Sequence, residues 1–329
     1  MKGAFQKALC VGVAAACFGC GPTKGGRVPE TVRFGLSLET PNALSIIALQ
    51  KGFFATEGLE VATTDYVSGA RALSAMLTGA VDVATVAEVP VVAESFQRQD
   101  FRIFASIASV GNQHWVVARK DAGIEKEADL RGKRVATQQM SSLHFFLHLF
   151  LLHNRLSEAD VTLSFRKLEE LVPALVNGEV DAIATREPYV GEVADRLGEK
   201  VVVLGARGVY VRTQHLAATA AWLREHPEAA RRLVRALLRA EDFARRDTAE
   251  ARRIVAERMG ISLSRFAAEW PQLRLRVTLD QSLLPQMEDE ARWMLDSRLV
   301  PATAIPNFLH LLDPAVLDAV KPGVVTIVH

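Results

Sequence analysis

Strand-like and helix-like stretches alternate along the chain after residue 30. Residues 31–38, 60–67 and 81–86 are rich in Val, Thr and Ala and are typical of strands. An apolar run follows Thr40-Pro41-Asn42, a helix-start signal, and residues 70–77 predict a second helix. Strands that alternate with helices at this spacing pair in parallel through right-handed crossovers. The pattern therefore predicts an α/β body.

One segment recurs in the second half of the chain. Residues 77–90 (LTGAVDVATVAEVP) align without gaps with residues 176–189 (VNGEVDAIATREPY). A strand, a polar turn and a long apolar helix precede each copy, in residues 31–50 and 133–152. Buried parallel strands are generally rich in Val and Ala, so chance similarity is the alternative. The shared spacing favours two similar lobes, whose strand carboxyl ends would face a common ligand site.

Composition and charge limit the classes of function that the protein can have. The chain has 329 residues, 39 Lys and Arg against 38 Asp and Glu, and 49% hydrophobic residues. Near-zero net charge argues against a general nucleic-acid binder. No apolar run reaches the roughly 20 residues that a membrane-spanning helix needs. The length suits two lobes of a folded body.

The beginning of the chain resembles an export signal. A basic start and an uncharged apolar stretch over residues 8–19 predict a signal peptide covering residues 1–19. Phe18-Gly19-Cys20 resembles the end of a bacterial lipobox, although Cys17 stands where that pattern prefers Leu. We expect Cys20 to be lipidated and residues 20–30 to form a tether; a plain secretory peptide cut nearby is the alternative. The other cysteines are Cys10 and Cys17, so a mature chain would have no disulfide.

Several motifs, in order, carry a family resemblance. They are KGFF with EGLEV (51–54 and 57–61), TGAVDVA (78–84), DLRGKRV (129–135), NGEVDA (177–182) and the Glu187-Pro188 pair. They resemble motifs of the ABC-transporter periplasmic binding proteins of the nitrate/sulfonate/taurine and thiamine-pyrimidine-precursor family. The chain departs from that pattern at Arg186, where an aromatic residue is frequent, and at Met140-Ser141, where a Gly-Thr/Ser turn is frequent.

The resemblance implies a type II periplasmic-binding fold, in which two lobes joined by two crossings enclose a ligand cleft. We expect lobe 1 to comprise residues 31–118 plus 215–329 and lobe 2 to comprise residues 119–214. The crossings would then be residues 114–119 and 209–213. A small-molecule solute, an ABC permease and its separate ATPase would be the partners, with a lipid anchor in the membrane, no nucleic acid and a monomeric state.

Candidate ligand-binding residues in lobe 1 follow three strands. They are Ser37, Glu39, Thr40, Asn42, Ser68, Gly69 and Glu88. Free backbone N–H groups at such helix starts favour an anion, and Gly69 would let the backbone approach a ligand. The alternative is that Thr40 or Asn42 simply caps its helix. If the carboxylates of Glu39 and Glu88 line the cleft, they would suit a positive or hydrogen-donating ligand group.

Candidates in lobe 2 occupy the corresponding positions. They are Gln138, Gln139, Ser141, Ser142, His144, Arg186, Glu187 and Tyr189. Ser and Gln side chains suit hydrogen bonds to sulfonate, nitrate or carboxylate oxygens. Arg186 could bind an oxyanion through its planar fork, or form an ion pair with Glu187 or Glu88. Glu187 could instead cap the helix that Pro188 opens, leaving Tyr189 as a cleft wall.

Other chemistries find little support. His144 and His148 lie four apart on a predicted helix, but the Glu of a zinc-protease motif is absent between them. No phosphate-binding Gly-rich loop occurs, so ATP hydrolysis would reside in a separate partner, and no nucleophile elbow occurs. We expect no metal, no cofactor and no enzymatic activity. The Arg-rich residues 222–260 interleave acidic residues and predict a solvated amphipathic helix.

The sequence thus predicts an extracytoplasmic, lipid-anchored solute receptor of an ABC importer. It would bind a small anionic solute, such as a sulfonate, nitrate or related organic acid, by closing its lobes. Two alternatives remain: binding or synthesis of a pyrimidine precursor, the latter an enzyme class, and a ligand sensor for a signalling partner.

Overall fold

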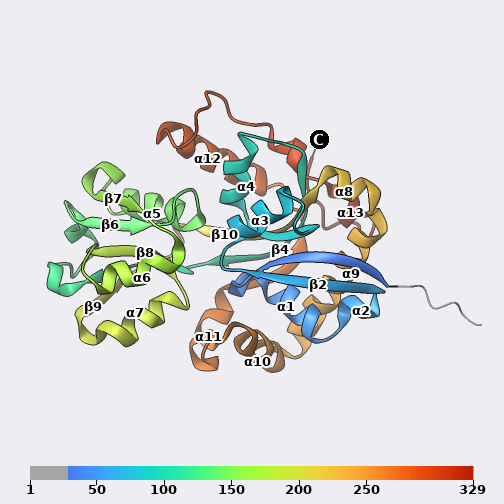
Figure 1. Cartoon of the computed structure of the whole chain (residues 1–329), viewed down its shortest axis with the longest axis horizontal. Coiled ribbons are helices and arrows are strands. Elements are labelled where there is room, and N and C mark those ends of the chain that lie inside the picture. Colours follow the sequence, from blue (N-terminus) through green and yellow to red (C-terminus); the bar gives the residue numbers. More distant parts are fainter. Residues whose placement is uncertain (1–28, 329) are drawn as a thin grey trace, which may run out of the picture.

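The computed structural model describes residues 29–328, which form two α/β lobes lying side by side (Figure 1). The predicted signal peptide, Cys20 and most of the predicted tether lie outside these residues. In the described part, no helix combines the length and the apolar character needed to cross a membrane.

The first lobe contains a six-stranded sheet in the order β11-β4-β10-β3-β1-β2. Its strands are β1 (Glu30–Ser37), β2 (Leu59–Tyr66), β3 (Val83–Ala87), β4 (Phe101–Gly111), β10 (Val211–Thr219) and β11 (Leu273–Thr278). Its helices are α1 (Ala43–Gln50), α2 (Phe53–Thr56), α3 (Gly69–Leu77), α4 (Glu88–Ser95), α8 (Ala220–Glu225), α9 (Pro227–Arg246), α10 (Thr248–Met259), α11 (Leu263–Glu269), α12 (Leu283–Asp296) and α13 (Pro314–Asp318).

The second lobe contains a five-stranded sheet in the order β7-β6-β8-β5-β9. Its strands are β5 (His114–Arg119), β6 (Arg134–Thr137), β7 (Thr162–Phe165), β8 (Ala182–Arg186) and β9 (Val201–Leu204). Its helices are α5 (Ser142–His153), α6 (Leu168–Val176) and α7 (Tyr189–Leu197). Short 3₁₀ helices punctuate both lobes: Thr40–Asn42, Lys120–Ala122, Glu127–Leu130, Glu158–Asp160, Gly198–Lys200, Trp270–Gln272 and Phe308–Leu311.

The two sheets share one plan, as the repeated segment predicted. In each sheet three parallel strands are followed by an antiparallel one: β2-β1-β3 then β10, and β7-β6-β8 then β5. The equivalence extends to side chains. Asp82 accepts the backbone N–H of Arg33 at 2.8 Å, and Asp181 accepts that of Arg134 at 2.9 Å. The Val-Asp pair therefore has the same role in both lobes.

The crossings differ from the expected ones. The chain passes between the sheets at residues 112–113 and 205–210, and the Gly208 N–H donates to the Asn112 Oδ1 at 2.9 Å. The expected first crossing, residues 114–119, is instead strand β5, paired with β8 and β9. Its apolar run hydrogen-bonds on both edges, so it belongs inside the second sheet. The expected second crossing ends too late, because Val211 already begins β10 in the first sheet.

The Arg-rich residues 222–260 form parts of three helices rather than one. Helix α9 begins at Pro227, and α10 begins after Asp247. The Asp247 carboxylate accepts the Glu250 N–H at 3.2 Å and so caps α10. The buried side chains of α9 are mostly Ala, Leu and Val and pack against α1, α2 and β11, while Arg239, Arg245 and Arg246 are exposed.

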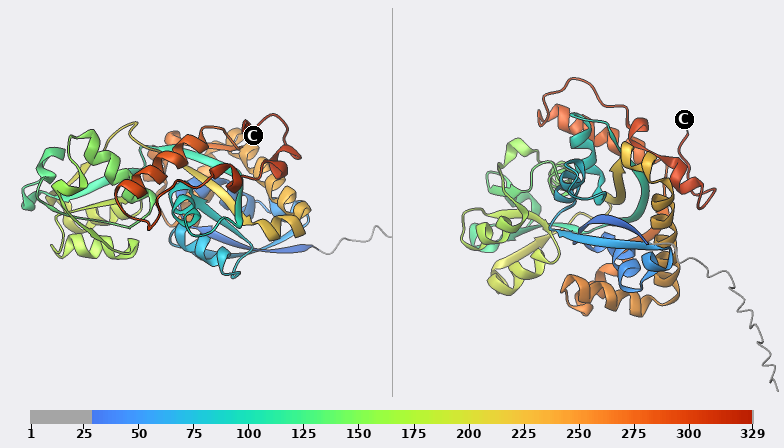
Figure 2. Two further views of the ribbon diagram at one scale, coloured as in Figure 1. Left: turned by 90° about the horizontal axis from the view of Figure 1, so that it is seen from above. Right: turned by 45° about the vertical axis from the view of Figure 1, so that its right-hand side comes forward.

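One helix of the second lobe joins the two hydrophobic cores. Helix α5 is apolar on nearly all sides, and eight of its twelve residues are buried. Phe145, Phe146 and Phe150 belong to the same buried cluster as Tyr210, at the end of the second crossing, and Trp293, on α12 of the first lobe. The lobes therefore share an apolar interface along α5, and the left view of Figure 2 shows the orange-red segment that contains α12 extending toward the second lobe.

Candidate functional site

The carboxyl ends of β1 and β3 in the first lobe face those of β6 and β8 in the second. Between them lies a cavity of about 20 Å³, hereafter the inner cavity. Seven candidate residues line it: Glu39, Ser68, Gly69, Gln138, Ser141, Ser142 and Arg186. A volume near 20 Å³ holds about one water molecule, so this site is closely packed. The structure thus gathers residues from four separated chain segments.

A buried ion triad connects the lobes across the inner cavity. Arg186 Nη2, from the second lobe, donates to Glu39 Oε1 at 2.8 Å and to the Val67 carbonyl at 3.2 Å. Arg212 Nη2, from the other face of the cavity, donates to Glu39 Oε2. All three charged residues are at most 4% exposed. Arg186 thus pairs with a different carboxylate from the predicted partners Glu187 and Glu88.

Two opposing effects set the ionisation of Glu39. Burial alone would raise the pKa of its carboxyl, but the charges and hydrogen bonds of Arg186 and Arg212 outweigh burial and lower the pKa. Glu39 is therefore a carboxylate at neutral pH. Together the three side chains carry one net positive charge in a site shielded from water.

A hydrogen-bonded wall stands behind the triad. Gln113 Nε2 donates to Glu269 Oε1 at 2.8 Å, and the Thr40 hydroxyl donates to the same oxygen at 2.5 Å. Gln113 Oε1 accepts from Arg212 Nη1 at 3.4 Å. Burial raises the pKa of Glu269, although these two hydrogen bonds oppose the shift. Thr40 therefore holds α11 against the crossing rather than capping its own helix.

Ser37 and Asn42 are buried beneath the inner cavity. The Ser37 N–H donates to the Thr85 hydroxyl at 2.8 Å, and Asn42 Nδ2 donates to the Ser37 carbonyl at 2.7 Å. Asn42 makes no side-chain cap of α1. These groups fix the strand-to-helix turn that carries Glu39, while lying outside the cavity lining.

Ser68 and Ser141 cap the helices that point at the cavity. The Ser68 hydroxyl accepts the Arg71 N–H at 3.5 Å, and the Ser141 hydroxyl accepts the His144 N–H at 3.4 Å. At Gly69 an added Cβ would lie 3.1 Å from the Val86 Cα. Glycine is therefore needed there for the close approach of α3 to β3.

Glu88 lies away from the cavity lining. Its carboxylate binds the Tyr210 hydroxyl and accepts the Thr213 N–H at 2.9 Å, and the residue is fully buried. Burial raises its pKa, against the hydrogen bond from Tyr210 and the charge of Arg212. Glu88 therefore ties α4 to the start of β10.

Two candidates, Glu187 and Tyr189, follow the carboxyl end of β8 and lie outside the lining of the inner cavity. Glu187 Oε2 accepts the Gly191 N–H at 3.1 Å and so caps α7, which was the alternative to ligand binding. Glu187 also lines a cavity of about 520 Å³ beside the crossings, together with Glu269 and Arg265. Tyr189 begins α7 and packs against the second lobe's own apolar cluster.

His144 is enclosed by aromatic rings. It is fully buried, and its ring lies 4.8 Å from the rings of Phe165 and Trp293, edge-on to both. His148 Nδ1 lies 3.1 Å from Glu158 Oε1. Within residues 29–328 no group of three metal-ligating side chains comes together.

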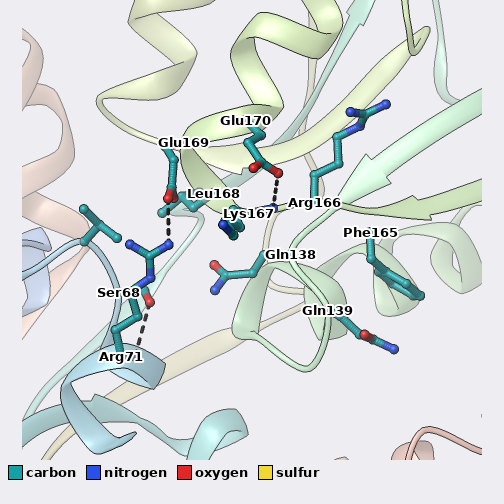
Figure 3. A pocket seen from close by; sticks show the side chains of 11 residues that line it. Ser68, Arg71, Gln138, Gln139, Phe165, Arg166, Lys167, Leu168, Glu169 and Glu170 are labelled. Atoms are coloured by element: carbon teal, nitrogen blue, oxygen red, sulfur yellow. Dashed lines mark hydrogen bonds and ion pairs between the residues drawn. The ribbon is translucent and has the colours of Figure 1, made fainter. Parts of the chain in front are cut away.

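A larger pocket adjoins the inner cavity and shares Ser68 and Gln138 with it. This pocket, hereafter the outer cleft, has a volume of about 470 Å³ and is shown in Figure 3. Arg71 of α3 reaches across it and pairs with Glu169 of α6 at 2.6 Å. Gln139, the remaining candidate, lines the outer cleft and not the inner cavity.

Several residues of the site were not among the candidates from the sequence. Arg212, Gln113 and Glu269 complete the inner polar network, and Arg71 and Lys167 add charge to the outer cleft. Arg212 had a signal, because it is a charged residue near the start of a strand whose later residues, Leu216 to Ala218, are apolar. Glu269 had none, since only the folded chain brings α11 to Thr40.

Comparisons with known proteins agree with this architecture. A family model described as NMT1/THI5 like matches residues 40–251. A putative aliphatic sulfonates-binding protein of Bacillus subtilis is 24% identical over 208 residues, which are 62% of each chain. The taurine-binding periplasmic protein of Escherichia coli is 25% identical over 162 residues, 49% of this chain and 50% of that protein. The chain thus spans between half and two thirds of the length of these relatives.

Solved structures share the fold at low identity. The alkanesulfonate-binding protein SsuA from Xanthomonas axonopodis pv. citri, bound to MOPS, has a TM-score of 0.75 and 19% identity, covering 88% of this chain and 100% of that one. The desulfurization enzyme DSZB has a TM-score of 0.63 and 18% identity, covering 88% and 98%. The type II periplasmic-binding architecture expected from the motifs is therefore confirmed.

Proposed function

The chain belongs to the NMT1/THI5-like family, and we propose that it is an extracytoplasmic solute-binding receptor of an ABC importer. It binds a small anionic solute between its lobes, of the class that includes sulfonates, nitrate and related organic acids. The observation that carries this proposal is the contact of Arg186 with Glu39 and the Val67 carbonyl, which joins the two lobes at the inner cavity. The names of the sulfonate-binding and taurine-binding relatives support it.

The mechanism is ligand-stabilised closure. A solute that contacts both lobes stabilises the closed arrangement over the open one by its differential affinity for the two. Arg186 on one lobe and Arg212 on the other supply two guanidinium groups against the single carboxylate of Glu39. The remaining positive charge favours a solute with one negative charge.

We further propose roles for the surrounding groups. Ser68, Gln138, Ser141 and Ser142 supply hydroxyl and amide groups at the cavity surface, and Gly69 keeps the α3 backbone close. The N-termini of α3 and α5, both at the cavity, add the positive ends of helix dipoles. Ser37, Asn42 and Thr40 hold the turn that carries Glu39.

We propose that the protein binds its solute without transforming it. The curated relatives named above are binding proteins, while the similarity to DSZB concerns the fold. A solute incubated with the protein should be recovered with unchanged mass. A mass change that depends on the folded protein would favour the enzymatic alternative.

We also propose an extracytoplasmic location with residues 1–19 removed and Cys20 lipidated. The basic and apolar leader supports this proposal. Metabolic labelling with a fatty acid tests it, because wild-type protein should incorporate label and Cys20→Ser should not. Labelling of both would contradict lipidation at Cys20. An ABC permease and its ATPase are the proposed membrane partners.

The central experiment measures binding and compaction together. Calorimetry and X-ray scattering with methanesulfonate, taurine and nitrate should find at least one ligand that binds and reduces the radius of gyration. Arg186→Met should weaken that binding at least tenfold. The control Arg98→Met removes an arginine paired with Asp100 outside both cavities and should bind as wild type does. Binding with no compaction, or equal binding by Arg186→Met, would contradict the closure mechanism.

A further inference from the structure

The outer cleft holds polar groups that the rest of the protein does not satisfy. Lys167 lines it and forms no ion pair with any of residues 29–328. Its neighbours are already paired: Arg71 with Glu169 at 2.6 Å, and Arg166 with Glu179 at 3.1 Å. Lys167 is therefore the cation of this cleft that remains available to a ligand.

Two glutamine side chains also line the outer cleft. The side chains of Gln138 and Gln139 line the outer cleft and make no hydrogen bond within the described part of the chain. Figure 3 shows the Gln138 amide extending into the space between Arg71 and Lys167. The Lys167 ammonium and the Gln138 amide N–H groups around this space are donors that can bind an oxyanion, while Figure 3 shows Gln139 pointing away from Lys167.

An exposed aromatic residue forms another part of the lining. Phe165, at the end of β7, is 41% exposed. Its ring packs edge-on against the buried His144 ring at 4.8 Å, which fixes its position. An exposed aromatic ring in a cleft offers a surface for an apolar or aromatic ligand group.

The sizes of the two spaces separate their roles. The inner cavity has about 20 Å³, and its two arginines are already bound to Glu39. The outer cleft has about 470 Å³, within the range of roughly 300–1,000 Å³ typical of pockets for organic ligands. In this arrangement of the lobes an organic molecule has room in the outer cleft, whereas the inner cavity would have to open to admit one.

We propose that the outer cleft selects organic anions with an apolar body, with Lys167 and Gln138 at the anionic group and Phe165 against the body. This inference rests on the proposed receptor function and specifies its solute class. Arg71 and Glu169, which pair across the same cleft, place this subsite on both lobes. A solute bound there touches the moving surfaces directly.

The test compares one large and one small sulfonate. Calorimetry should show 1-naphthalenesulfonate binding at least tenfold tighter than methanesulfonate, and tighter than the uncharged 2-naphthol. Phe165→Ala should remove most of the advantage of 1-naphthalenesulfonate and leave methanesulfonate unchanged. Lys167→Gln should weaken 1-naphthalenesulfonate about five- to tenfold and leave 2-naphthol unchanged.

Matched controls use exposed residues of the same lobe outside the cleft. Leu152→Ala removes an apolar side chain that is 50% exposed on α5, and Lys126→Gln removes a surface ammonium. Neither should change binding of 1-naphthalenesulfonate. Because Lys167 is exposed, Lys167→Gln should also keep the wild-type unfolding midpoint, whereas Phe165→Ala, which loses the packing on His144, should stay folded with a lower midpoint.

The outcomes separate the two proposals. If methanesulfonate or taurine binds in an Arg186-dependent manner while Phe165→Ala and Lys167→Gln behave as wild type toward 1-naphthalenesulfonate, the outer subsite is overturned and the receptor function stands. Equal affinities for the large and small sulfonates also overturn the subsite. If no probe binds and no compaction occurs, both proposals fail.

Discussion

Arg186 of the second lobe and Glu39 of the first form a buried ion pair, with Nη2 and Oε1 2.8 Å apart. Glu39 is shared, because its other oxygen binds Arg212. The carboxylate is thus the common counter-charge of two guanidinium groups from different lobes. Removing Glu39 and removing one arginine should therefore lower the free energy of unfolding by different amounts.

We expect Glu39→Gln to destabilise the protein more than Arg186→Met. The first change leaves two buried arginines without a counter-charge and should cost about 3–5 kcal/mol. The second leaves Glu39 with Arg212 and should cost about 1.5–3 kcal/mol, the value of a hydrogen bond to a charged group. Guanidinium unfolding at pH 7 measures both. A larger cost for Arg186→Met would show that Glu39 is not the shared counter-charge.

Glu290 should make the protein less stable at alkaline pH. It is fully buried, and burial together with the charge of Glu88 raises the pKa of its carboxyl well above 4.5. The folded state therefore retains a proton that the unfolded state loses above pH 4.5, so this group's contribution to stability falls as pH rises toward its folded pKa.

Glu290→Gln removes the ionisable carboxyl, and with it this loss of stability at higher pH. The stability of the variant relative to wild type should rise by up to about 1.4 kcal/mol per pH unit above pH 4.5, until the folded pKa is reached. Unfolding free energies at pH 4, 6 and 8 measure the difference. Glu288→Gln, an exposed position on the same helix, is the control and should give a flat difference. A flat difference for Glu290→Gln would mean that its carboxyl ionises normally.

Trp293 should help to hold the lobes together away from the ligand site. Its ring, on α12 of the first lobe, lies 4.8 Å from His144 and 5.1 Å from Phe145 of α5. Trp293→Ala should cost about 3–5 kcal/mol through the cavity it leaves. It should also increase the radius of gyration in X-ray scattering, because an interlobe contact is lost.

Trp293→Phe separates packing from hydrogen bonding. It keeps a ring against α5 and loses only the donation from Nε1 to Glu158 Oε1 at 3.4 Å. We expect a cost of about 0.5–1.5 kcal/mol and an unchanged radius of gyration. A Trp293→Ala protein that is less stable but as compact as wild type would assign this residue to core packing alone.

The repeated Val-Asp pairs should contribute equally to the two lobes. Asp82 and Asp181 each accept a backbone N–H and bind the same residue's guanidinium, from Arg33 and Arg134 respectively. Asp82→Asn and Asp181→Asn should each cost about 0.5–2 kcal/mol, and the double variant should cost their sum, since the pairs are distant. Asp121→Asn, at an exposed surface pair, should cost less than either of these variants. Strongly unequal destabilisation by Asp82→Asn and Asp181→Asn would contradict an equal contribution of the two Val-Asp pairs to stability.

Much of the fold could be predicted from local patterns. The expected strand over residues 31–38 corresponds to Glu30–Ser37, and the expected helix over 70–77 to Gly69–Leu77. These predictions succeeded because apolar spacing and turn residues act within a few positions. The crossings failed for the opposite reason: whether residues 114–119 bridge the lobes or join a sheet depends on distant partners in β8 and β9.

The candidate site divides in the same way. The sequence alone determined which positions end strands and begin helices, and so placed Glu39, Ser68, Gln138 and Arg186 among the candidates that line the inner cavity. Only the tertiary structure decided that Arg186 faces Glu39, that Arg212 joins them and that Glu88 turns away to Tyr210. The physical reason is range: strand and helix signals are read from neighbouring residues, whereas a buried charge finds its counter-charge only when chain segments far apart in sequence have packed together.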